Sequence, residues 1–202
     1  MAVPPPPPLS PLDEKRTIRA TLRASRAAHV ARLRDEGCHD AAHAAAAHAL
    51  AHVPAGATVA LYRSLGDELD PAPFADLLIA AGHRLALPHV DRGDPTMRFL
   101  AWHPEAPLFE GMFGLRQPHD ASEPVVPDVI VTPLVGFDRA GGRIGQGGGF
   151  YDRAFALLPG AFRIGYGWSA QEIATVPRDP WDIALDGIAT EREWIDVTKT
   201  GQ

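Results

Sequence analysis

The sequence predicts an α/β fold in which a mostly parallel sheet is layered with helices. Two features of the chain support this prediction. Its 202 residues are enough for one domain with a sizeable core. After residue 54, short apolar runs bounded by turn residues alternate with helical segments. Strands that alternate with helices favour parallel pairing, because each helix returns the chain to the same edge of the sheet.

Two helices are predicted before the sheet begins. The first spans Asp13–Glu36, a charged and alanine-rich segment with few apolar anchors, and Gly37 ends it. The second spans about His39–His52, is dominated by alanine and stops at Pro54.

The rest of the chain supplies the sheet and further helices. Strands are predicted at Thr58–Tyr62, Arg84–Leu87, Met97–Leu100, Val129–Val135, Arg163–Tyr166 and Ile188–Thr190. Helices are predicted at Pro73–Ala81 and Phe150–Leu158. No internal repeat is visible, so residues 13–202 are expected to form a single domain.

Residues 1–12 are predicted to be a disordered tail. Pro4–Pro8 form an unbroken run of prolines, and Pro11 follows it. Such a stretch favours polyproline II and cannot join a core. A ligand for a proline-reading domain is the alternative, but the composition favours a disordered or extended tail.

The composition excludes several classes of protein. Hydrophobic residues make up 46%, charged residues 22%, and the net charge is −6. This is typical of a soluble globular protein without a general attraction to nucleic acid or anionic membranes. No apolar run has the length of a membrane span, and the N-terminus does not have the pattern of a signal peptide, so a cytoplasmic protein is expected.

Cys38 is the only cysteine, which excludes an intramolecular disulfide and a cysteine–zinc site. A passive helix cysteine is favoured over a nucleophile, because its neighbourhood offers no fixed cation to activate it.

The second predicted helix is rich in histidine. His39/His43 and His48/His52 are pairs with the i,i+4 spacing that can share a metal. At about 100° per residue, however, the two pairs point in roughly opposite directions and cannot form one site with four ligands. Solvated histidines are therefore favoured over a metal site.

The most informative segment is Asp128–Leu158, which reads DVIVTPLVGFDRAGGRIGQGGGFYDRAFALL. An apolar strand leads to Arg143, a glycine-rich loop at 145–149 and a helix. Glycines before a helix N-terminus let backbone N–H groups converge on an anion, and the helix dipole adds to the attraction. Arg143 would add a fixed charge. Asp152, in the first helical turn, would either cap the helix or hold a divalent cation.

This glycine-rich loop does not match the common nucleotide-binding motifs. It lacks G-x-x-x-x-G-K-[ST], and Phe150 stands where G-x-G-x-x-G would need its last glycine. A tight structural turn is therefore the alternative when the loop is taken alone.

The stretch R-I-G-Q-G-G-G-F-Y-D closely resembles R-L-G-x-G-x-G-[YF]-Y-D, the nucleotide-loop signature of the 5-formyltetrahydrofolate cyclo-ligase family. The resemblance continues in order along almost the whole chain after the tail. The other matching blocks are Lys15–Arg19, Tyr62–Asp70, Leu87–His89 with Met97–Phe99, and Val176-Pro177 with Asp182 and Leu185–Glu191.

The chain departs from the family pattern at a few positions. Gln117 stands where the family usually has glutamate before proline, and Trp181 stands where it usually has histidine before aspartate. Residues 133–136 read Pro-Leu-Val-Gly in place of the usual Pro-Gly-Val-Ala. These departures concern substrate affinity, because they leave the residues proposed for phosphate and metal in place.

The resemblance implies a three-layer Rossmann-like sandwich of the phosphosugar isomerase/CoA transferase-like type. It also implies conversion of 5-formyltetrahydrofolate and ATP into 5,10-methenyltetrahydrofolate, ADP and phosphate. Phosphorylation of the formyl oxygen would turn that oxygen into a leaving group for attack by N10. ATP as co-substrate, Mg²⁺, a small folate substrate, no nucleic-acid or membrane partner and a monomeric state are expected.

The resemblance also implies roles for individual residues. The nucleotide would be bound by Lys15, Arg16, Thr17, Ile18, Arg19, Arg143, Ile144, Gly145, Gln146, Gly147, Gly148, Gly149, Phe150 and Tyr151. The folate would be bound by Arg63, Glu68, Gln146, Gly147, Gly148, Gly149 and Phe150. Lys15, Arg143 and Tyr151 would be catalytic, and Asp152 and Asp186 would hold the metal.

Each of these roles has a simpler alternative. Lys15 and Arg19 lie one helical turn apart and can reach one anion, or they form a solvated basic face. Glu68 would accept hydrogen bonds from the pterin, or it is a solvated turn acid. Tyr151, like Phe150 and Trp102, would stack on pterin or adenine, or belongs to the core.

Two other functions remain open from the residues alone. An isomerase or acyl transferase of the same fold would need an acid/base dyad or a catalytic glutamate setting, and none is visible. A non-catalytic folate- or nucleotide-binding paralogue would have no need of the complete Arg143–Asp152 loop and Asp186.

Overall fold

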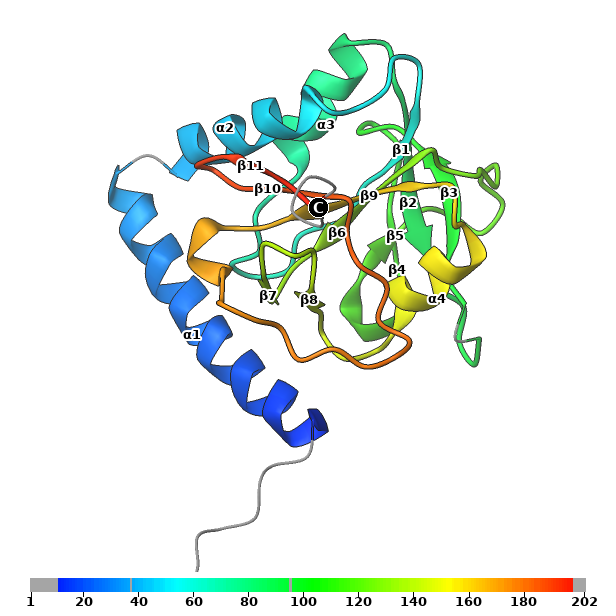
Figure 1. Ribbon diagram of the computed structural model, residues 1–202. Helices are drawn as coiled ribbons and strands as arrows, with labels where there is room; N and C mark the ends of the chain where they lie inside the picture. The colour runs from blue at the N-terminus through cyan, green and yellow to red at the C-terminus, as the bar shows by residue number, and fades with distance from the viewer. Residues whose placement is uncertain (1–10, 37, 95, 198–202) are drawn as a thin grey trace, which may run out of the picture.

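The computed structural model describes residues 11–36, 38–94 and 96–197. Its centre is a seven-stranded sheet with the strand order β11-β10-β9-β6-β1-β2-β3 (Figure 1). Strands β10, β9, β6, β1 and β2 run parallel to one another, whereas the edge strands β11 and β3 are antiparallel to their neighbours. The predicted α/β fold with a mostly parallel sheet is confirmed.

The predicted strands are all present, with bounds that differ by a few residues. The sheet is formed by β1 (Thr58–Ala60), β2 (Arg84–His89), β3 (Arg98–Trp102), β6 (Val129–Pro133), β9 (Phe162–Tyr166), β10 (Gly187–Ala189) and β11 (Trp194–Asp196). The sequence predicts no strand at β11, because three residues are too few to show an alternating pattern.

Several short elements connect the sheet strands. They are the pair β4 (Phe109–Glu110) and β5 (Arg116–Gln117) with the 3-10 helix η1 (Met112–Gly114), the pair β7 (Gly136–Phe137) and β8 (Arg143–Ile144), and η2 (Ser169–Gln171). None of these is predicted from the sequence, because two- or three-residue elements have no periodicity of their own.

The helices are α1 (Pro11–Glu36), α2 (Cys38–Leu50), α3 (Ala72–Ala80) and α4 (Phe150–Leu157). Helix α1 begins two residues before its predicted start, so Pro11 and Leu12 belong to the helix and not to the tail. Proline suits the first position of a helix, because its missing N–H would have no partner there. Residues 1–10 of the predicted tail lie outside the described residues.

Successive residues of the strands contribute to two different cores. Val59, Val131 and Ile164 belong to the cluster that α2 and α3 cover, whereas Ala60 and Ile130 belong to the cluster under α4. Side chains alternate between the two faces of a strand, so each face meets its own helices. The arrangement of helix, sheet and helix is consistent with the predicted three layers.

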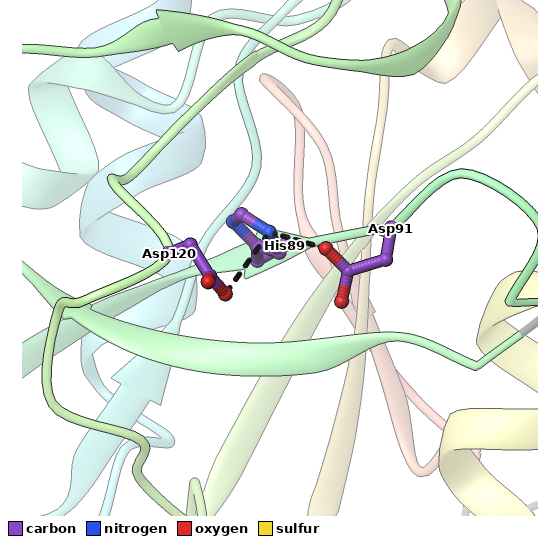
Figure 2. Close-up of side chains that lie close together, drawn as sticks. All are labelled: His89, Asp91 and Asp120. Carbon is purple, nitrogen blue, oxygen red and sulfur yellow. Dashed lines mark hydrogen bonds and ion pairs between the residues drawn. The ribbon is translucent and has the colours of Figure 1, made fainter.

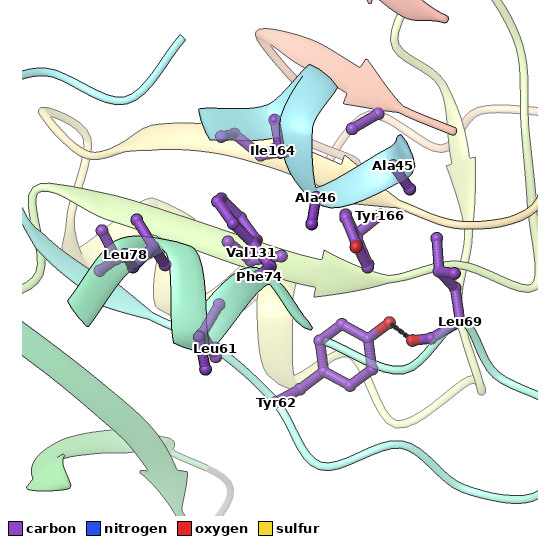
Figure 3. Packing of buried hydrophobic residues seen from close by; sticks show 14 of the residues in the cluster. Ala45, Ala46, Leu61, Tyr62, Leu69, Phe74, Leu78, Val131, Ile164 and Tyr166 are labelled. Atoms are coloured by element: carbon purple, nitrogen blue, oxygen red, sulfur yellow. Dashed lines mark hydrogen bonds between the residues drawn. The ribbon is translucent and has the colours of Figure 1, made fainter. Parts of the chain in front are cut away.

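Helix α2 packs closely because its buried side chains are small. Ala45, Ala46 and Ala49 are fully buried against the sheet and α3. Figure 3 shows Ala45 and Ala46 close to Phe74 of α3 and to Tyr166, and the Phe74 and Tyr166 rings are stacked with centroids 5.7 Å apart. The alanine-rich composition thus explains how a helix comes to lie directly on the sheet.

The α2 histidines lie in separate environments. His39 is exposed and His43 is half-buried, with their Nε2 atoms 3.1 Å apart. His48 Nδ1 lies 2.9 Å from the carbonyl of Thr190, and the His52 ring stacks on Trp194 at 3.9 Å. The two pairs therefore have different neighbours, and the absence of a shared metal site stays a prediction.

Cys38 is partly buried at the start of α2, as expected for a passive cysteine. Within the described ranges, no helix is both long enough and apolar enough to cross a membrane. The cytoplasmic location and the monomeric state stay predictions.

Candidate active site

The glycine-rich loop connects β8 to α4 and depends on glycine at two positions. Gly147 and Gly149 have φ values of +102° and +66°, in the left-handed region that other residues avoid. A Cβ atom at Gly149 would lie 2.9 Å from the Arg153 guanidinium. Gly149 also precedes α4, and no described side chain caps this helix. The loop therefore leaves the first amides of α4 available to an anion.

Helix α1 lies along this loop and contacts it through arginines. Arg19 donates from Nε to the carbonyl of Gly145 at 2.9 Å, and its guanidinium lies beside Gly147. One turn further along, Arg23 donates to the side chain of Gln146 at 2.5 Å. The spacing of four residues keeps both arginines on one helix face. The predicted grouping of Arg19 with the glycine loop is therefore present in the structure.

Lys15 is held by two acids that the sequence does not assign to the site. Its Nζ donates to Asp179 at 2.7 Å and to Asp182 at 2.6 Å, and the Lys15 side chain is 8% exposed. Burial opposes the charge of Lys15, but the hydrogen bonds and charges of both acids outweigh it and raise the lysine's pKa. Burial likewise opposes ionisation of Asp182, yet hydrogen bonds from the Asp179 N–H and Lys15 lower its pKa.

The first helical turns also bring predicted nucleotide residues to this region. Ile18 is partly buried against a small apolar cluster that contains Leu22 of α1 and Ile144 of β8. Arg16 and Thr17 are exposed on α1. This cluster joins α1 to the strand that leads into the glycine-rich loop, beside the arginine contacts described above.

Arg143 is buried and occupied by protein groups. It donates to the carboxylate of Asp152 and to the carbonyl of Ile183, and its guanidinium lies 4.6 Å from the centre of the Phe155 ring. Burial lowers the pKa of Arg143 although Asp152 counteracts this effect. The structure thus gives Arg143 the geometry of a residue that positions Asp152, and its contact with phosphate stays a prediction.

Asp152 keeps one oxygen for a ligand. Its Oδ1 accepts from Arg143 and lies 3.5 Å from the N–H of Ile183. Its Oδ2 has no hydrogen-bond partner among the residues that the structure describes, and the side chain is 26% exposed. Asp152 is therefore oriented and accessible, which a metal ligand needs.

Glu68 and the glycine loop lie together although 78 residues separate Glu68 from Gln146. The Gln146 amide donates to Glu68 Oε1 at 3.0 Å, and the N–H of Leu65 donates to Oε2 at 3.0 Å. Arg26 of α1 lies 3.9 Å from Oε1, and both side chains are almost buried. Glu68 is therefore a fixed, buried carboxylate and not a solvated turn acid.

Tyr151 lies in the first turn of α4 and interacts electrostatically with both Glu68 and Arg143. Burial and then the charge of Glu68 raise the pKa of Tyr151, while the charge of Arg143 lowers it. Its ring also packs against Phe155, with centroids 6.2 Å apart. Tyr151 is thus a neutral phenol within electrostatic range of both Glu68 and Arg143, as its predicted position on the loop requires.

The remaining predicted aromatic and loop residues lie around this centre. Phe150 packs partly into the core below α4, and the guanidinium of Arg153 lies 5.0 Å from its ring centre. Gly148 is exposed. Arg63 and Trp102 line a shallow hollow on the other side of Tyr62.

Asp186 has a different partner from the one the resemblance implies. Arg163 donates to both of its oxygens at 2.7 Å, and the Arg163 backbone N–H donates to Oδ2 at 2.8 Å. This bidentate pair joins the starts of the parallel strands β9 and β10. In the described part of the chain, no hydrogen bond or ion pair joins Asp186 to Asp152. Its role as a metal ligand stays a prediction that would require release from Arg163.

A second cluster of possible metal ligands lies at the end of β2. Figure 2 shows His89, Asp91 and Asp120 around a common point, and their ligand atoms lie within 4.8 Å of one another. However, Arg98 donates to Asp91 at 2.8 Å and to Asp120 at 2.6 Å. Hydrogen bonds from His89 and then Arg98 lower the pKa of Asp91. Because a cation already bridges the carboxylates, this cluster is an ion-pair network that fixes two loops.

Comparisons with known proteins show which family the chain belongs to. The sequence model of the 5-formyltetrahydrofolate cyclo-ligase family matches residues 11–191. The 5-formyltetrahydrofolate cyclo-ligase of Escherichia coli (strain K12) is 35% identical over 144 residues, which cover 66% of this chain and 77% of that protein. The protein of the same name from Haemophilus influenzae is 30% identical over 138 residues, covering 63% and 72%.

Two solved structures are also similar. The NMR structure of Aquifex aeolicus 5,10-methenyltetrahydrofolate synthetase matches with a TM-score of 0.75 and 28% identity, covering 91% of this chain and 92% of that chain. A 5,10-methenyltetrahydrofolate synthetase from Mycoplasma pneumoniae matches with a TM-score of 0.67 and 24% identity, covering 88% and 98%, and supports the fold alone. Since the family match spans almost the whole described chain, this protein is an enzyme that belongs to the 5-formyltetrahydrofolate cyclo-ligase family.

Proposed function

We propose that this chain uses ATP to cyclise 5-formyltetrahydrofolate to 5,10-methenyltetrahydrofolate, with release of ADP and phosphate. The observation that carries the proposal is the contact between Gln146 and Glu68 at 3.0 Å. It joins a loop suited to phosphates and a buried carboxylate suited to a pterin in one site. An enzyme that transfers a phosphoryl group to the folate needs both ligands side by side.

The nucleotide end of the site suits ATP phosphates. The uncapped amides of α4 and the cations Lys15 and Arg19 would face the triphosphate from two sides. Lys15 now binds Asp179 and Asp182, so phosphate oxygens would compete with these acids for its N–H donors. A cation with a raised pKa stays charged near neutral pH, as phosphate binding requires.

The residues also fit a magnesium ion. Asp152 offers one free oxygen at the end of the glycine loop, and Mg²⁺ prefers one or two carboxylates with water and phosphate oxygens. When bound there, Mg²⁺ would neutralise charge on the phosphates. Arg143 would hold Asp152 in place for this purpose.

The folate end of the site suits the pterin ring. Glu68 would exchange the amide of Gln146 for the amino and ring N–H groups of the pterin, which are donors of the same kind. Tyr151, whose pKa is raised, would present a neutral ring and hydroxyl next to this carboxylate. Such a ring can stack on the pterin without adding charge.

The proposed chemistry uses no covalent bond to the protein. The formyl oxygen attacks the γ-phosphorus, and the bond from that phosphorus to ADP breaks. N10 then attacks the activated carbon and loses its proton, and the carbon–oxygen bond breaks to release phosphate. The enzyme would contribute alignment and charge stabilisation, which this set of cations and backbone amides can supply.

One assay tests this proposal directly. The protein is incubated with 5-formyltetrahydrofolate and MgATP, and the absorbance of the methenyl product is followed together with ADP. One ADP is expected for each methenyl product. ADP without cyclisation, or cyclisation without ATP, would refute the proposal.

Variants of neighbouring acids locate the folate site. Glu68→Gln should raise the folate KM far more than the ATP KM, because an amide cannot accept from two N–H groups equally well. Asp67→Asn is the matched control, since Asp67 pairs with the exposed Arg34. An unchanged folate dissociation constant in Glu68→Gln would remove this residue from the site.

A further inference from the structure

Glu68 lies in the loop that joins β1 to α3, and the backbone on both sides of it is held by a buried aromatic side chain. The indole Nε1 of Trp168 donates to the carbonyl of Asp67 at 3.0 Å. The hydroxyl of Tyr62 donates to the carbonyl of Leu69 at 2.5 Å, as Figure 3 shows. The residues immediately before and after Glu68 are therefore each fixed by one hydrogen bond from an aromatic donor.

Trp168 is itself anchored in the core. It lies two residues after the end of β9 and directly before η2, and it is 2% exposed. Its backbone N–H donates to the side chain of Gln171 at 2.8 Å, and the buried Gln171 amide donates in turn to the carbonyls of Leu134 and Val135, which follow β6. The indole N–H is therefore a fixed donor, which reaches the Glu68 loop from the ends of two central strands.

The loop needs such outside support to hold a carboxylate still. Residues 61–71, all of which the structure describes, form neither helix nor strand. The Asp67 side chain adds little, because it pairs with Arg34, which is 67% exposed. Burial and then the charge of Glu68 raise the pKa of Tyr62, so its hydroxyl keeps the proton that it donates. Tyr62 and Trp168 thus supply buried contacts to a segment that has no regular hydrogen-bond ladder of its own.

We propose that Trp168 and Tyr62 are positioning residues for folate binding, which act by holding the Glu68 carboxylate in place. This inference rests on the proposed function, because it takes Glu68 as the acceptor of hydrogen bonds from the pterin. A carboxylate that accepts two hydrogen bonds from a rigid, planar ring must keep its orientation. Neither aromatic side chain has to contact the ligand, since each acts through a backbone carbonyl next to Glu68.

Phenylalanine at either position removes the donor and keeps an aromatic ring. Trp168→Phe and Tyr62→Phe should each raise the dissociation constant of 5-formyltetrahydrofolate roughly three- to tenfold and leave that of ATP nearly unchanged. Calorimetry with the full chain measures both constants. Trp194→Phe is the matched control, because it makes the same chemical change at an indole whose buried N–H has no hydrogen-bond partner among the described residues. This control should bind both ligands as wild type does.

A double-mutant cycle with Glu68→Gln separates positioning from a general structural role. If Trp168 acts through the Glu68 carboxylate, Trp168→Phe should change the folate dissociation constant by less than about twofold once Glu68 is replaced by glutamine. A residue that only supports the fold would cause the same loss in both backgrounds. Equilibrium dialysis measures the weaker constants of the Glu68→Gln proteins, and thermal unfolding establishes that each variant is folded at the temperature of the measurement.

The possible outcomes are distinct. Equal losses of affinity for folate and ATP, no loss at all, or an equal folate loss in both Glu68 backgrounds would overturn the inference. If Trp168→Phe failed to fold, Tyr62→Phe would decide by the same criteria.

The inference and the proposed function can also fail separately, because binding does not require turnover. A chain that shows this coupling in folate binding but forms no methenyl product would contradict the proposed function and support the inference. A chain that forms the product with ATP, and whose two phenylalanine variants bind folate as wild type does, would do the reverse. A chain that binds no folate would overturn both.

Discussion

Helices α1 and α2 follow each other in the chain but pack by opposite means. Helix α2, with 13 residues, lies on the sheet through buried alanines such as Ala45 and Ala49. Helix α1, with 26 residues, lies at the side of the sheet and contacts η2 and α2. Its buried residues include Lys15, Arg26 and His29 besides two aliphatic side chains.

The comparison shows that α2 contributes mainly to the core, whereas α1 contributes side chains to the proposed site. The methyl groups of α2 contact many neighbours and specify no particular one. The cations of α1 each have a named partner: Lys15 binds Asp179 and Asp182, Arg19 binds Gly145, and Arg26 approaches Glu68. The contacts that hold α1 are therefore the same contacts that assemble the proposed site. Changes in the α2 core should alter stability alone, and changes on α1 should alter activity.

The largest expected effect is the loss of stability when a large side chain is removed from the core between α2 and α3. Phe74 is fully buried and stacks with Tyr166, so Phe74→Ala should reduce the free energy of unfolding by about 3–5 kcal/mol. The substrate KM values of the folded fraction should not change. Denaturant unfolding measures the loss. Leu157→Ala is the control, since Leu157 is 65% exposed and should lose almost nothing. Equal losses in the two variants would contradict this description of the core.

The next effect concerns α1. Lys15→Met should lower kcat/KM for ATP roughly ten- to hundredfold, because a charge-assisted contact to phosphate is lost, while the folate KM changes little. Steady-state kinetics with each substrate varied in turn measures this. Arg34→Met removes another cation of α1, but Arg34 is 67% exposed and pairs only with Asp67 among the described residues. That variant should behave as wild type. Wild-type ATP kinetics in Lys15→Met would make Lys15 a purely structural residue.

Much of this contrast can be predicted from the sequence. Alanine at almost every core-facing position of residues 42–49 predicts a helix that packs closely, and the glycines at 145–149 predict a loop before a helix. Both are local patterns, which a single segment carries by itself. The ordered blocks that resemble the family add Glu68, which no local pattern singles out. They also favour a metal over a helix cap for Asp152, whose position alone leaves both roles open.

The pairing of charges could not be predicted in the same way. Lys15 and Asp182 are 167 residues apart, and only the folded chain brings them together. The Gln146–Glu68 contact and the pair of Arg163 with Asp186 have the same origin. Asp186 illustrates the difference. The resemblance to the family predicts that it binds the metal, whereas in the structure both of its carboxylate oxygens accept hydrogen bonds from Arg163.

A pair of aspartate variants tests that difference. Asp152→Asn should raise the Mg²⁺ concentration needed for half-maximal rate, and it should also lower the Tm, because it leaves the buried Arg143 without its carboxylate partner. Asp186→Asn should lower the Tm by a few degrees, since it weakens a bidentate ion pair, and its Mg²⁺ dependence decides between a structural residue and the predicted metal ligand. Metal titration of activity and thermal unfolding measure the two properties. A raised Mg²⁺ requirement in Asp186→Asn would establish Asp186 as a metal ligand after all.

The smallest expected effect is the pH dependence of the α1 contact. The folded pKa of Asp182 is lowered from 3.8, so its contribution to stability is present above pH 3.8 and is lost as the pH falls through the folded value. The folded pKa of Lys15 is raised from 10.5, so its contribution is present below pH 10.5 and is lost as the pH rises through the folded value. The contact should therefore be at full strength between these limits.

This window can be measured as a difference between two proteins. The unfolding free energy of wild type minus that of Lys15→Met should be constant from about pH 5 to pH 9, at roughly 1 kcal/mol for a partly exposed pair. It should shrink as the pH falls below 3.8 and through the lowered pKa of Asp182, because a protonated Asp182 no longer attracts the lysine. Taking the difference cancels the protonation of carboxylates elsewhere in the chain. The same difference for Arg34→Met should stay near zero throughout, because that pair is exposed. A wild-type minus Lys15→Met difference that persists unchanged at pH 3 would show that the contribution of Lys15 to stability does not come from its ion pairs with these acids.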